Sequence, residues 1–413
     1  MRILWVKAGK ILPVDTGGRI RSFHILRALA HREQVTFLSY YGGRRDAEYE
    51  AAISREIPGT ITIHTGAAET KAGQALDYSW NLHKPAPYAV TKFTNARVRQ
   101  RIADWYAEGR FDVHVCDFLS ASLNFPSTLS APTVLFQHNV ESALWQRVAA
   151  TETHPVKRHF FKIEASKMLR YERSALQRFH HVVAVSENDR GQMRGMSPSC
   201  PITVVPTGVD CTEFTVAPPS RTPPERIVFV GSMDWEPNID AVTYFAAEIW
   251  PSIRNQFPQA TFEIVGRNPH PKVQRLASDS IKVTGTVPAV TDYFREATIV
   301  VVPLRAGGGT RLKIFEAMAM GKAVVSTSIG AEGLDVQSGR DLILADTSAA
   351  FIDSITMLLR DEGTRHKYEQ AAAKLASQYD WSRIGEHFLS VLEQTVALHR
   401  AQSKNSGPVP VHS

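Results

Sequence analysis

The sequence predicts an α/β protein of two doubly wound, Rossmann-like domains, each built on a parallel sheet. Its 413 residues exceed the roughly 100 to 200 residues typical of one domain. Short segments rich in β-branched residues alternate with helical segments in both halves, which is the pattern of βαβ units. A proline-rich stretch lies between the halves, and such a composition is typical of an interdomain linker.

The first half, residues 1–207, begins with a strand, a loop and a helix. RILWV is interpreted as the strand, DTGGRI as a glycine-containing loop, and the stretch through Leu26 and Leu29 as the helix. Polar residues or glycines follow each strand, at the edge where ligands bind in parallel sheets. Further strands are expected at QVTFLSYY, FDVHVCD, PTVLFQHN, HVVAVS and ITVVPTGVD, and a long helix at about 155–178.

The second half repeats this alternation after a linker assigned to residues 208–225, which contain four prolines. The second domain is assigned to 226–380. An amphipathic helix at 381–400 is expected to pack back on the N-terminal domain, and 401–413 to form a disordered tail. Strands are expected at RIVFVGS, TFEIVGR, IKVTGTV, IVVVPL, AVVSTS and DLILAD, and helices near 240–256 and 311–320.

Composition narrows the class of protein only in part. Hydrophobic residues make up 43% of the chain and charged residues 21%, which is ordinary for a globular protein. The formal charge of +6 is compatible with nucleic acid, an anionic membrane surface or a phosphorylated substrate. Zinc-finger spacing, an RNA-recognition aromatic motif and long Lys/Arg blocks are all missing, which disfavours nucleic acid.

The chain is expected to be cytoplasmic. Its apolar runs are far shorter than the ~18 to 20 residues that cross a bilayer. The opening MRILWVKAGK has four apolar residues before a lysine, too few for the core of a secretory signal. Cys116, Cys200 and Cys211 are widely spaced, so neither a disulfide framework nor a metal knuckle is expected.

The segment from 304 to 334 carries the strongest chemical pattern. Three glycines, Gly307, Gly308 and Gly309, can bring backbone N–H groups close to an anion, and a helix begins just after them. Arg311 and Lys313 add cations at this helix start. Together these features indicate a diphosphate site, although a flexible turn before a solvated helix would show the same local pattern.

Glu316 lies about one turn into that helix. Its carboxylate is placed to accept hydrogen bonds from a pair of sugar hydroxyls, or it is simply an exposed helix glutamate. An NAD-dependent enzyme would share the two-domain architecture. However, G-x-G-x-x-G is missing from both first loops, where only Gly17-Gly18 and Gly231 stand. An oxidoreductase is therefore the weaker hypothesis.

The segment EAMAMGKAVVSTSIGAEGL resembles the signature region of the retaining, nucleotide-sugar-dependent glycosyltransferases of family four, which have the GT-B fold of two facing Rossmann-like domains. The resemblance extends in consistent order over most of the chain. It includes VVPTGVD before the linker, FVGSMDWEPN at the start of the second domain, VTGTV, and DW before the last helix. It implies a nucleoside diphosphate sugar as donor.

In that family two glutamates face the donor, the first contacting the transferred sugar and the second the ribose. Glu316 matches the second, but the first position falls at Gly308, so this chain departs from the pattern. Two interpretations remain. Either backbone amides of the GGGTR-x-K segment, Gly307 to Thr310, replace the carboxylate's sugar contact, or the site is impaired.

The resemblance also implies contacts to the phosphates and the base. The family often supplies an Arg and a Lys from the loop after the first strand of the second domain, but here that loop, GSMDWEPN, begins at Gly231 and has no cation. Arg311 and Lys313 would then bind the diphosphate. Thr286 and Val287 match positions whose backbone meets the base, unless they are an ordinary strand end.

The first domain contributes His138, which FQHNVES places just past a buried strand. The family has a histidine in a comparable place that touches the donor sugar, although a lone histidine is often structural. Gly17 and Gly18 match a loop that admits donor phosphate or acceptor; a tight turn alone is the alternative. Further candidates, most of them for acceptor contact, are Asp15, Arg19, Arg21, Glu141 and Ser186.

The helix at 155–178 and its preceding residue carry seven Lys and Arg interleaved with apolar residues. Such a surface can dock on anionic lipids, but a solvated helix with its apolar side in the core is an equal alternative. Neither HEXXH nor Asp-x-Asp nor a His/Cys cluster appears at a suitable turn, so no metal is expected.

The sequence therefore predicts a metal-independent retaining glycosyltransferase that needs no cofactor. It would move a hexose from a nucleoside diphosphate sugar to an acceptor hydroxyl, in exopolysaccharide, lipopolysaccharide or glycolipid biosynthesis. The acceptor would be a saccharide or a lipid-linked molecule. The protein would be cytoplasmic, with peripheral contact to an anionic membrane as a further expectation. The alternatives are a catalytically impaired nucleotide-sugar-binding protein and an epimerase or phosphorylase on the same scaffold.

Overall fold

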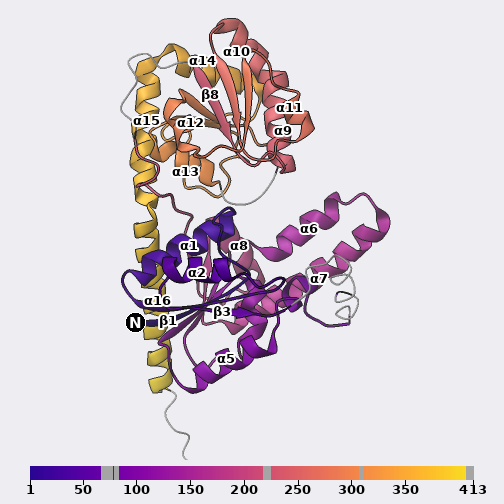
Figure 1. Cartoon of the computed structure of the whole chain (residues 1–413), viewed down its shortest axis with the longest axis vertical. Helices are drawn as coiled ribbons and strands as arrows, with labels where there is room; N and C mark the ends of the chain where they lie inside the picture. Colours follow the sequence, from indigo (N-terminus) through magenta and orange to yellow (C-terminus); the bar gives the residue numbers. More distant parts are fainter. Residues whose placement is uncertain (67–77, 79–82, 217–224, 307–310, 406–413) are drawn as a thin grey trace, which may run out of the picture. The chain divides into compact units, whose positions relative to one another are not determined.

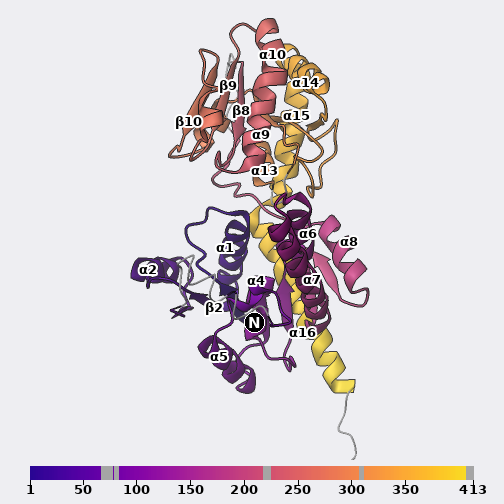
Figure 2. The same cartoon turned by 90° about the vertical axis from the view of Figure 1, so that its right-hand side faces the viewer.

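The computed structural model of the protein describes residues 1–66, 78, 83–216, 225–306 and 311–405. It contains two compact units (Figure 1). Unit 1 comprises Met1–Pro206 and the C-terminal segment from Ile384, and unit 2 comprises Thr207–Arg383. Each described unit contains one parallel sheet with helices packed against it, as Figures 1 and 2 show. The predicted α/β class with two Rossmann-like domains is confirmed.

The described strands of unit 1 form a seven-stranded sheet in the order β3-β2-β1-β4-β5-β6-β7, with every neighbouring pair parallel. The sheet is covered on both faces, so β4 and β5 are buried along their whole length and β1 along most of it. The register sets Lys7 beside Asp117 at the carboxyl end of the two central strands. The strands are β1 (Arg2–Ala8), β2 (Gln34–Tyr41), β3 (Thr60–His64), β4 (Val113–Asp117), β5 (Thr133–Phe136), β6 (His181–Ala184) and β7 (Ile202–Val204).

Several helices of unit 1 begin where the sequence offers a capping side chain. Asp46, Asn95 and Ser186 each accept a backbone N–H in the first turn of α2, α5 and α8. Gly17 and Gly18 form the first turn of α1 rather than the predicted loop. The described helices are α1 (Gly17–Ala30), α2 (Ala47–Glu56), α4 (Tyr88–Thr91), α5 (Ala96–Ala107), the 3₁₀ turn η1 (Leu119–Asn124), α6 (Glu141–Thr151), α7 (Pro155–Arg178) and α8 (Glu187–Met196).

The described strands of unit 2 form a six-stranded parallel sheet in the order β10-β9-β8-β11-β12-β13. The central strand β11 is buried along its whole length, as its continuous Ile-Val-Val-Val run predicts. The expected strand at DLILAD is only two residues long. The strands are β8 (Arg226–Val230), β9 (Thr261–Val265), β10 (Ile281–Gly285), β11 (Ile299–Val302), β12 (Ala323–Ser326) and β13 (Ile343–Leu344).

The helix expected near 240–256 is one helical stretch with an irregular middle. Its central turn, η2 (Phe245–Ile249), is a π-helical turn just before Pro251, a residue that cannot donate an intrahelical hydrogen bond. The flanking helices of unit 2 are α9 (Glu236–Tyr244), α10 (Trp250–Gln256), α11 (Pro271–Gln274), α12 (Thr291–Glu296), α13 (Leu312–Ala319), α14 (Ser348–Arg360), α15 (Glu362–Ala376) and the 3₁₀ turn η3 (Ser377–Tyr379).

The described part of the predicted linker, residues 208–216, is folded within unit 2. Val209 donates its N–H to the Tyr379 carbonyl at 2.9 Å, and Phe214 belongs to the core of this unit. The linker prediction relied on composition, but burial of Val209 and Phe214 anchors this stretch in unit 2. Residues 217–224 lie outside the described residues.

The closing helix α16 (Trp381–Asn405) is longer than predicted, so residues 401–405 are helical instead of forming a tail. From Ile384 on, the helix belongs to unit 1. Phe388 packs on Trp5 and Phe136, with ring centroids 5.3 and 5.1 Å apart. Gly385 permits a close approach to α1, because a Cβ there would lie 2.4 Å from Ala28 Cβ.

Within the described residues, none of the helices combines the length and the apolar character that a bilayer span requires.

The cysteines Cys116, Cys200 and Cys211 are free thiols, and burial raises the pKa of each thiol above its ordinary value. The cysteines are therefore poor nucleophiles at neutral pH.

Candidate functional site

Three charged or polar side chains meet at the carboxyl edge of the unit 1 sheet. Asp117 ends β4, Lys7 lies beside it on β1, and His138 follows β5. Lys7 Nζ lies 3.2 Å from Asp117 Oδ1 and donates to Ser22 Oγ at 3.0 Å. His138 Nε2 lies 2.7 Å from the same Asp117 oxygen. The chain therefore builds a buried polar network under the start of α1.

Asp117 is the centre of this network and is fully buried. Its second oxygen, Oδ2, accepts the indole N–H of Trp5 at 2.9 Å. Burial by itself raises the pKa of the carboxyl group, but the charge of Lys7 and the hydrogen bond from His138 outweigh it and hold the pKa well below the ordinary range. Asp117 is thus a carboxylate at neutral pH.

His138 has both ring nitrogens engaged. Arg21, which can only donate, places Nη1 3.0 Å from Nδ1, and the carboxylate of Asp117 accepts from Nε2. The ring is therefore neutral with its proton on Nε2. Burial, together with the charges of Arg21 and Lys7, lowers the pKa of His138 to about 4, even though Asp117 acts in the opposite direction.

Nitrogen-15 NMR of the imidazole checks this assignment. We expect His138 to stay neutral and Nε2-protonated down to about pH 4, whereas exposed histidines titrate near ~6.5. Replacing Arg21 by methionine removes the donor to Nδ1 and is expected to let the ring exchange tautomers. An imidazolium signal for His138 at pH 6 in the parent protein would contradict this description of the network.

The other predicted residues of the first domain lie around this network or at the surface. A Cβ on Gly18 would lie 3.8 Å from His138 Nδ1, so Gly18 flanks the ring. Arg21, predicted as an acceptor contact, is only 2% exposed and its guanidinium contacts His138. Asp15 and Arg19 form a surface ion pair with Nη1 and Oδ1 2.9 Å apart.

Glu141 begins α6 and lies close to a second carboxylate. Glu172 of α7 is fully buried and accepts the backbone N–H groups of Glu141 and Ser142, each at 2.9 Å. Burial, followed by the charge of Glu172, raises the pKa of Glu141 to about 7. Glu141 can therefore exchange a proton near neutral pH. Ser186 serves as the cap of α8, with Oγ accepting from the Asp189 N–H at 3.1 Å.

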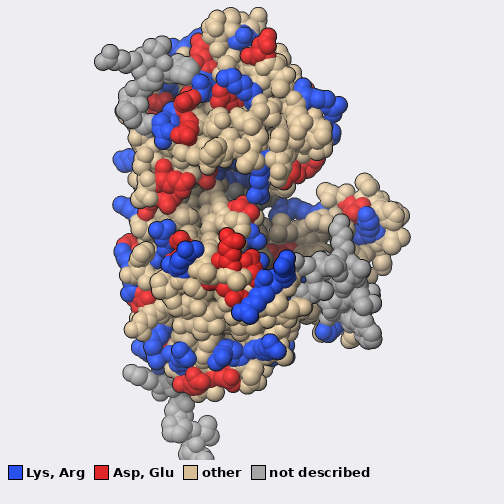
Figure 3. All heavy atoms as spheres, in the orientation of Figure 1, with Lys and Arg blue, Asp and Glu red and all other residues tan. Residues whose placement is uncertain are grey.

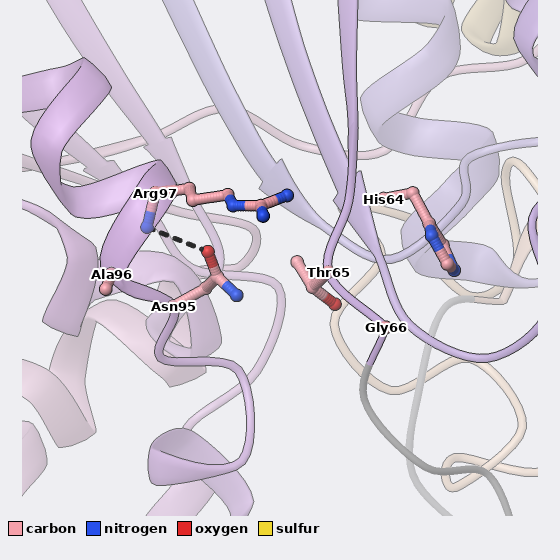
Figure 4. A pocket seen from close by; sticks show the side chains of 6 residues that line it. All are labelled: His64, Thr65, Gly66, Asn95, Ala96 and Arg97. Atoms are coloured by element: carbon pink, nitrogen blue, oxygen red, sulfur yellow. Dashed lines mark hydrogen bonds between the residues drawn. The ribbon is translucent and has the colours of Figure 1, made fainter.

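A pocket of about 440 Å³ opens at the carboxyl end of β3 (Figure 4). It is lined by the end of β3 and the start of α5, where the Asn95 side chain accepts the Arg97 N–H at 3.0 Å. Figure 4 shows the Arg97 side chain extending along the pocket toward β3. Sequence reasoning missed this pocket because neither β3 nor α5 was predicted. Its lining residues are His64, Thr65, Gly66, Asn95, Ala96 and Arg97.

In unit 2 a second polar cluster forms at the carboxyl edge of the sheet, around Lys313 at the start of α13. Lys313 Nζ donates to Asn238 Oδ1 at 3.1 Å and lies 4.3 Å from the centre of the Phe229 ring. A Cβ on Gly231 would lie 2.7 Å from this ammonium group, so only glycine leaves it room. Burial, followed by the charge of Arg311, lowers the pKa of Lys313 to about 7.

Glu316 lies one turn further along α13, on the side of Lys313. Burial raises its pKa to about 7, Lys313 opposes that rise, and Glu213 adds to it. Arg311, the residue before the helix, is 3% exposed. Its Nη2 donates to the Ile329 carbonyl at 2.9 Å, which ties the start of α13 to the turn after β12.

The remaining predicted donor residues lie apart from this cluster or outside the described residues. Thr286 and Val287 follow β10, immediately after Gly285, which has a positive φ of 72°. Gly307, Gly308, Gly309 and Thr310 lie outside the described residues. Among the residues that are described, no three His, Cys, Asp or Glu side chains gather as metal ligands would.

Two family models match the chain, roughly one for each unit. The family model described as Glycosyltransferase Family 4 matches residues 17–213, and the model described as Glycosyl transferases group 1 matches residues 224–361. Together the two models match most of the chain. The chain belongs to the family-four glycosyltransferases. Its fold is the GT-B fold, and both matching models describe glycosyltransferases.

Curated relatives of this glycosyltransferase include phosphatidyl-myo-inositol mannosyltransferases. That of Mycolicibacterium smegmatis is 26% identical over 362 residues, covering 84% of this chain and 86% of the relative. That of Mycobacterium leprae is 26% identical over 338 residues, covering 79% and 83%. The D-inositol 3-phosphate glycosyltransferase of an Arthrobacter strain is 30% identical over 119 residues, covering 27% and 28%.

Solved structures share the fold at low sequence identity. Anabaena HepE in complex with UDP matches with a TM-score of 0.67 at 15% identity, covering 95% of this chain and 100% of that one. Sucrose-phosphate synthase from Thermosynechococcus elongatus matches with a TM-score of 0.65 at 15% identity, covering 96% and 99%. Both matches span the two units of this glycosyltransferase.

Proposed function

We propose that this family-four glycosyltransferase moves a hexose from a nucleoside diphosphate sugar to an acceptor hydroxyl with retention of anomeric configuration. The observation that carries the proposal is the cluster of Lys313, Glu316 and Asn238 at the carboxyl edge of the unit 2 sheet. Ligands of doubly wound sheets bind at this edge. The reaction proposed needs neither a metal ion nor a resident cofactor.

The donor diphosphate would be bound by Lys313 and the start of α13. The amino end of a helix carries a partial positive charge, and its first N–H groups favour anions. Asn238 and Gly231 position the ammonium group, since one accepts its hydrogen bond and the other leaves space for it. The departing nucleoside diphosphate gains negative charge during transfer, so a cation here stabilises the leaving group.

Arg311 has a different role in this proposal from the one predicted. Its guanidinium is buried and bonded to the Ile329 carbonyl, so it fixes the start of α13 and adds positive potential from below the surface. Glu316 would accept hydrogen bonds from the ribose hydroxyls. The backbone amides of Gly307 to Gly309 remain candidates for the sugar contact that a glutamate makes elsewhere in the family.

In unit 1, His138 is only 3% exposed, so in this proposal a positioning role replaces the predicted direct contact with the donor sugar. Both of its ring nitrogens are held by Arg21 and Asp117, so the imidazole cannot act as a nucleophile while these bonds last. Its role would be to fix the start of α1 against the ends of β4 and β5. The developing oxocarbenium character of the sugar would be balanced by the phosphate rather than by His138.

Diphosphate binding should depend on pH through Lys313 and Glu316, whose pKa values both lie near 7. Above pH 7 the lysine loses its proton and its attraction for phosphate. Below pH 7 the glutamate gains a proton and accepts hydroxyl hydrogen bonds less well. We expect affinity for UDP or GDP to peak near neutrality and to fall by up to about tenfold per pH unit on either side.

Isothermal titration calorimetry of the parent and of Glu316→Gln separates the two groups. The variant should lose the fall on the acidic side and keep the fall on the alkaline side. Unchanged affinity of the parent from pH 6 to pH 9 would exclude a titrating lysine from the diphosphate site.

The relatives support a class of acceptor. Phosphatidyl-myo-inositol mannosyltransferases are named for a lipid acceptor, and structural neighbours were solved with UDP and UDP-glucose. We therefore favour a lipid-linked or saccharide acceptor in exopolysaccharide, lipopolysaccharide or glycolipid biosynthesis. The protein would act in the cytoplasm with peripheral contact to an anionic membrane.

The test is transfer itself. Purified protein is incubated with a panel of nucleoside diphosphate hexoses and with lipid or saccharide acceptors, with and without EDTA. NMR of the product gives the anomeric configuration of the new bond. A product with the donor's configuration, formed equally with EDTA, supports the proposal, and an inverted product contradicts it.

Three other functions are separated by the same assay. A nucleotide-sugar-binding protein without turnover, suggested by glycine at position 308, would bind donor but form no product with any acceptor. An epimerase would convert the donor without an acceptor alcohol, and a phosphorylase would require phosphate instead.

A further inference from the structure

Helices α6 and α7 form an antiparallel hairpin that projects from unit 1 (Figure 1). The two helices are joined by a short turn ending at His154, which caps α7, and Pro155 occupies its first turn. Trp145 and Phe161 contact each other between the helices, with ring centroids 6.1 Å apart. These aromatic residues hold the hairpin closed.

The two halves of α7 differ in what they pack against. From Glu164 onward the helix contributes buried side chains to unit 1, and Glu164 itself accepts the Tyr88 N–H at 2.9 Å. Residues 155–163 contribute no buried side chain. We call this outer half of α7, together with α6 residues 147–151 and the turn, the hairpin tip. Among the described residues it is held by its partner helix and by the ring of Tyr78, whose centroid lies 4.8 Å from that of Phe160.

Apolar side chains nevertheless face outward on the hairpin tip. Val156 is 71% exposed, Val148 is 45% exposed and Ile163 is 43% exposed. Val156 and Ile163 are two helical turns apart and so lie on one side of α7. Exposed apolar side chains that gather on one side of a helix end, rather than standing singly, mark a contact with a membrane or a partner.

Cations surround these apolar side chains. Residues 147–163 contain four Lys or Arg and one acid, Glu152. None of the four forms an ion pair with a residue that the structure describes, in contrast to Lys167 and Glu164 nearer the core, which lie 3.3 Å apart. On the face visible in Figure 3, the end of the hairpin shows mostly uncharged atoms with charged ones among them. The four cations are Arg147, Lys157, Arg158 and Lys162.

We propose that the hairpin tip docks this protein on the surface of an anionic lipid bilayer. Exposed valine and isoleucine side chains would enter the boundary between head groups and acyl chains, and the flexible lysines and arginines would reach the lipid phosphates. The unpaired positive charge selects a negative partner. The scattered apolar side chains, too few for a protein core, match the shallow insertion of an interfacial helix.

This inference deepens the membrane contact that is part of the proposed function, while its observations come from the tip alone and its test does not depend on transfer. It assigns the membrane contact to one end of the helix predicted from the sequence at about 155–178. The other end, from Glu164, is the solvated and core-packed helix of the alternative interpretation. Both interpretations thus apply, each to half of the helix.

Vesicle sedimentation without donor or acceptor tests the proposal. Full-length protein is mixed with phosphatidylcholine vesicles or with vesicles that also contain phosphatidylglycerol, at low and high salt. One variant carries Val148→Ser, Val156→Ser and Ile163→Ser, and a second carries Lys157→Gln, Arg158→Gln and Lys162→Gln. A matched control removes three exposed cations from α5 of the same unit: Arg97→Gln, Arg99→Gln and Arg101→Gln.

We expect the parent to bind the anionic vesicles preferentially and less tightly at high salt. Each tip variant should bind about tenfold or more weakly, because each cation near the surface and each inserted apolar group adds to the partition coefficient. The α5 control should bind within about twofold of the parent, since its cations would not face the bilayer. All variants should melt like the parent, because the substituted side chains are exposed.

Four outcomes would overturn the proposal: no preference of the parent for anionic vesicles, parent-like binding by both tip variants, an equal loss in the α5 control, or a parent dimer that only the serine variant dissociates. The last would assign the tip to a second copy of the chain. Failure here leaves glycosyl transfer to a soluble acceptor unaffected, so the two proposals are judged separately.

Discussion

Replacing Lys313 by methionine is expected to weaken binding of the donor's nucleoside diphosphate by roughly 10- to 100-fold, because a charge-assisted hydrogen bond to phosphate is worth about 1.5–3 kcal/mol. Methionine keeps an apolar chain over the Phe229 ring, so the packing of α13 should survive. Calorimetry with UDP, GDP and ADP gives the loss for whichever diphosphate the parent binds.

Lys272→Met on α11 is the matched control, because it removes an exposed cation from the same unit. It should change affinity by less than about twofold, as a screened surface charge does. Equal losses in both variants would mean that Lys313 contributes only net charge and makes no specific contact.

The substitution Gly231→Ala tests the proposed contact between Lys313 and phosphate in an independent way. The new Cβ would lie 2.7 Å from Lys313 Nζ and 2.8 Å from Asn238 Nδ2, and the flexible lysine would move away. Affinity should therefore fall although no charge is removed. Parent-like affinity in Gly231→Ala would show that the position of Lys313 seen here is not the one that binds phosphate.

Replacing Asp117 by asparagine is expected to reduce the free energy of unfolding by about 3–5 kcal/mol, the cost of leaving a buried charge without its partner. Lys7 would lose its counter-ion, and the donors of Trp5 and His138 would compete for one remaining acceptor oxygen. Urea denaturation of parent and variant at pH 7 measures the difference.

Asp112→Asn is the control, because Asp112 pairs with Arg2 at the surface, with Nη2 and Oδ1 3.3 Å apart. The free energy of unfolding should fall by less than about 1 kcal/mol in this variant, as is usual for exposed ion pairs. If Asp117→Asn cost no more than Asp112→Asn, the buried network would contribute nothing to the stability of unit 1.

The same network predicts a direction for acid unfolding. The pKa of Asp117 is lower in the folded state than in the unfolded chain. The stability that Asp117 contributes to the folded state is therefore fully present above its pKa of ~3.8 in the unfolded chain. This stability is lost as the pH falls through the pKa of Asp117 in the folded state. The pKa of His138 is also lowered, so the unfolded state takes up a proton between about pH 6.5 and 4 and stability falls over that window too.

The sequence alone was sufficient to predict the helices and strands that have strong local patterns. β11 is a run of β-branched residues, and α13 has apolar residues at helical spacing, so both are present where predicted. Lys313 and Glu316 could be selected because they share the helix that follows a glycine-rich segment. Gly231 was noticed only as part of a missing motif, and its close approach to Lys313 is visible only in three dimensions.

Contacts between distant segments could not be predicted. Asp117, Lys7 and Arg21 come from three separate elements, and only the strand register and the position of α1 bring them to His138. A polar residue at the end of FDVHVCD was the one available signal for Asp117. β3 has half-buried residues throughout and no buried apolar run, so the pocket beside it was missed as well.

The central claim is that unit 2 binds a nucleoside diphosphate without a metal. The most direct measurement is the melting temperature of the protein with UDP, GDP, ADP, dTDP and their common sugars, with UMP and NAD as controls and with or without magnesium. A ligand that binds only the native state raises this temperature. The account predicts a rise of several degrees with one diphosphate family, unchanged by magnesium and absent for UMP and NAD. A rise with NAD alone would contradict it.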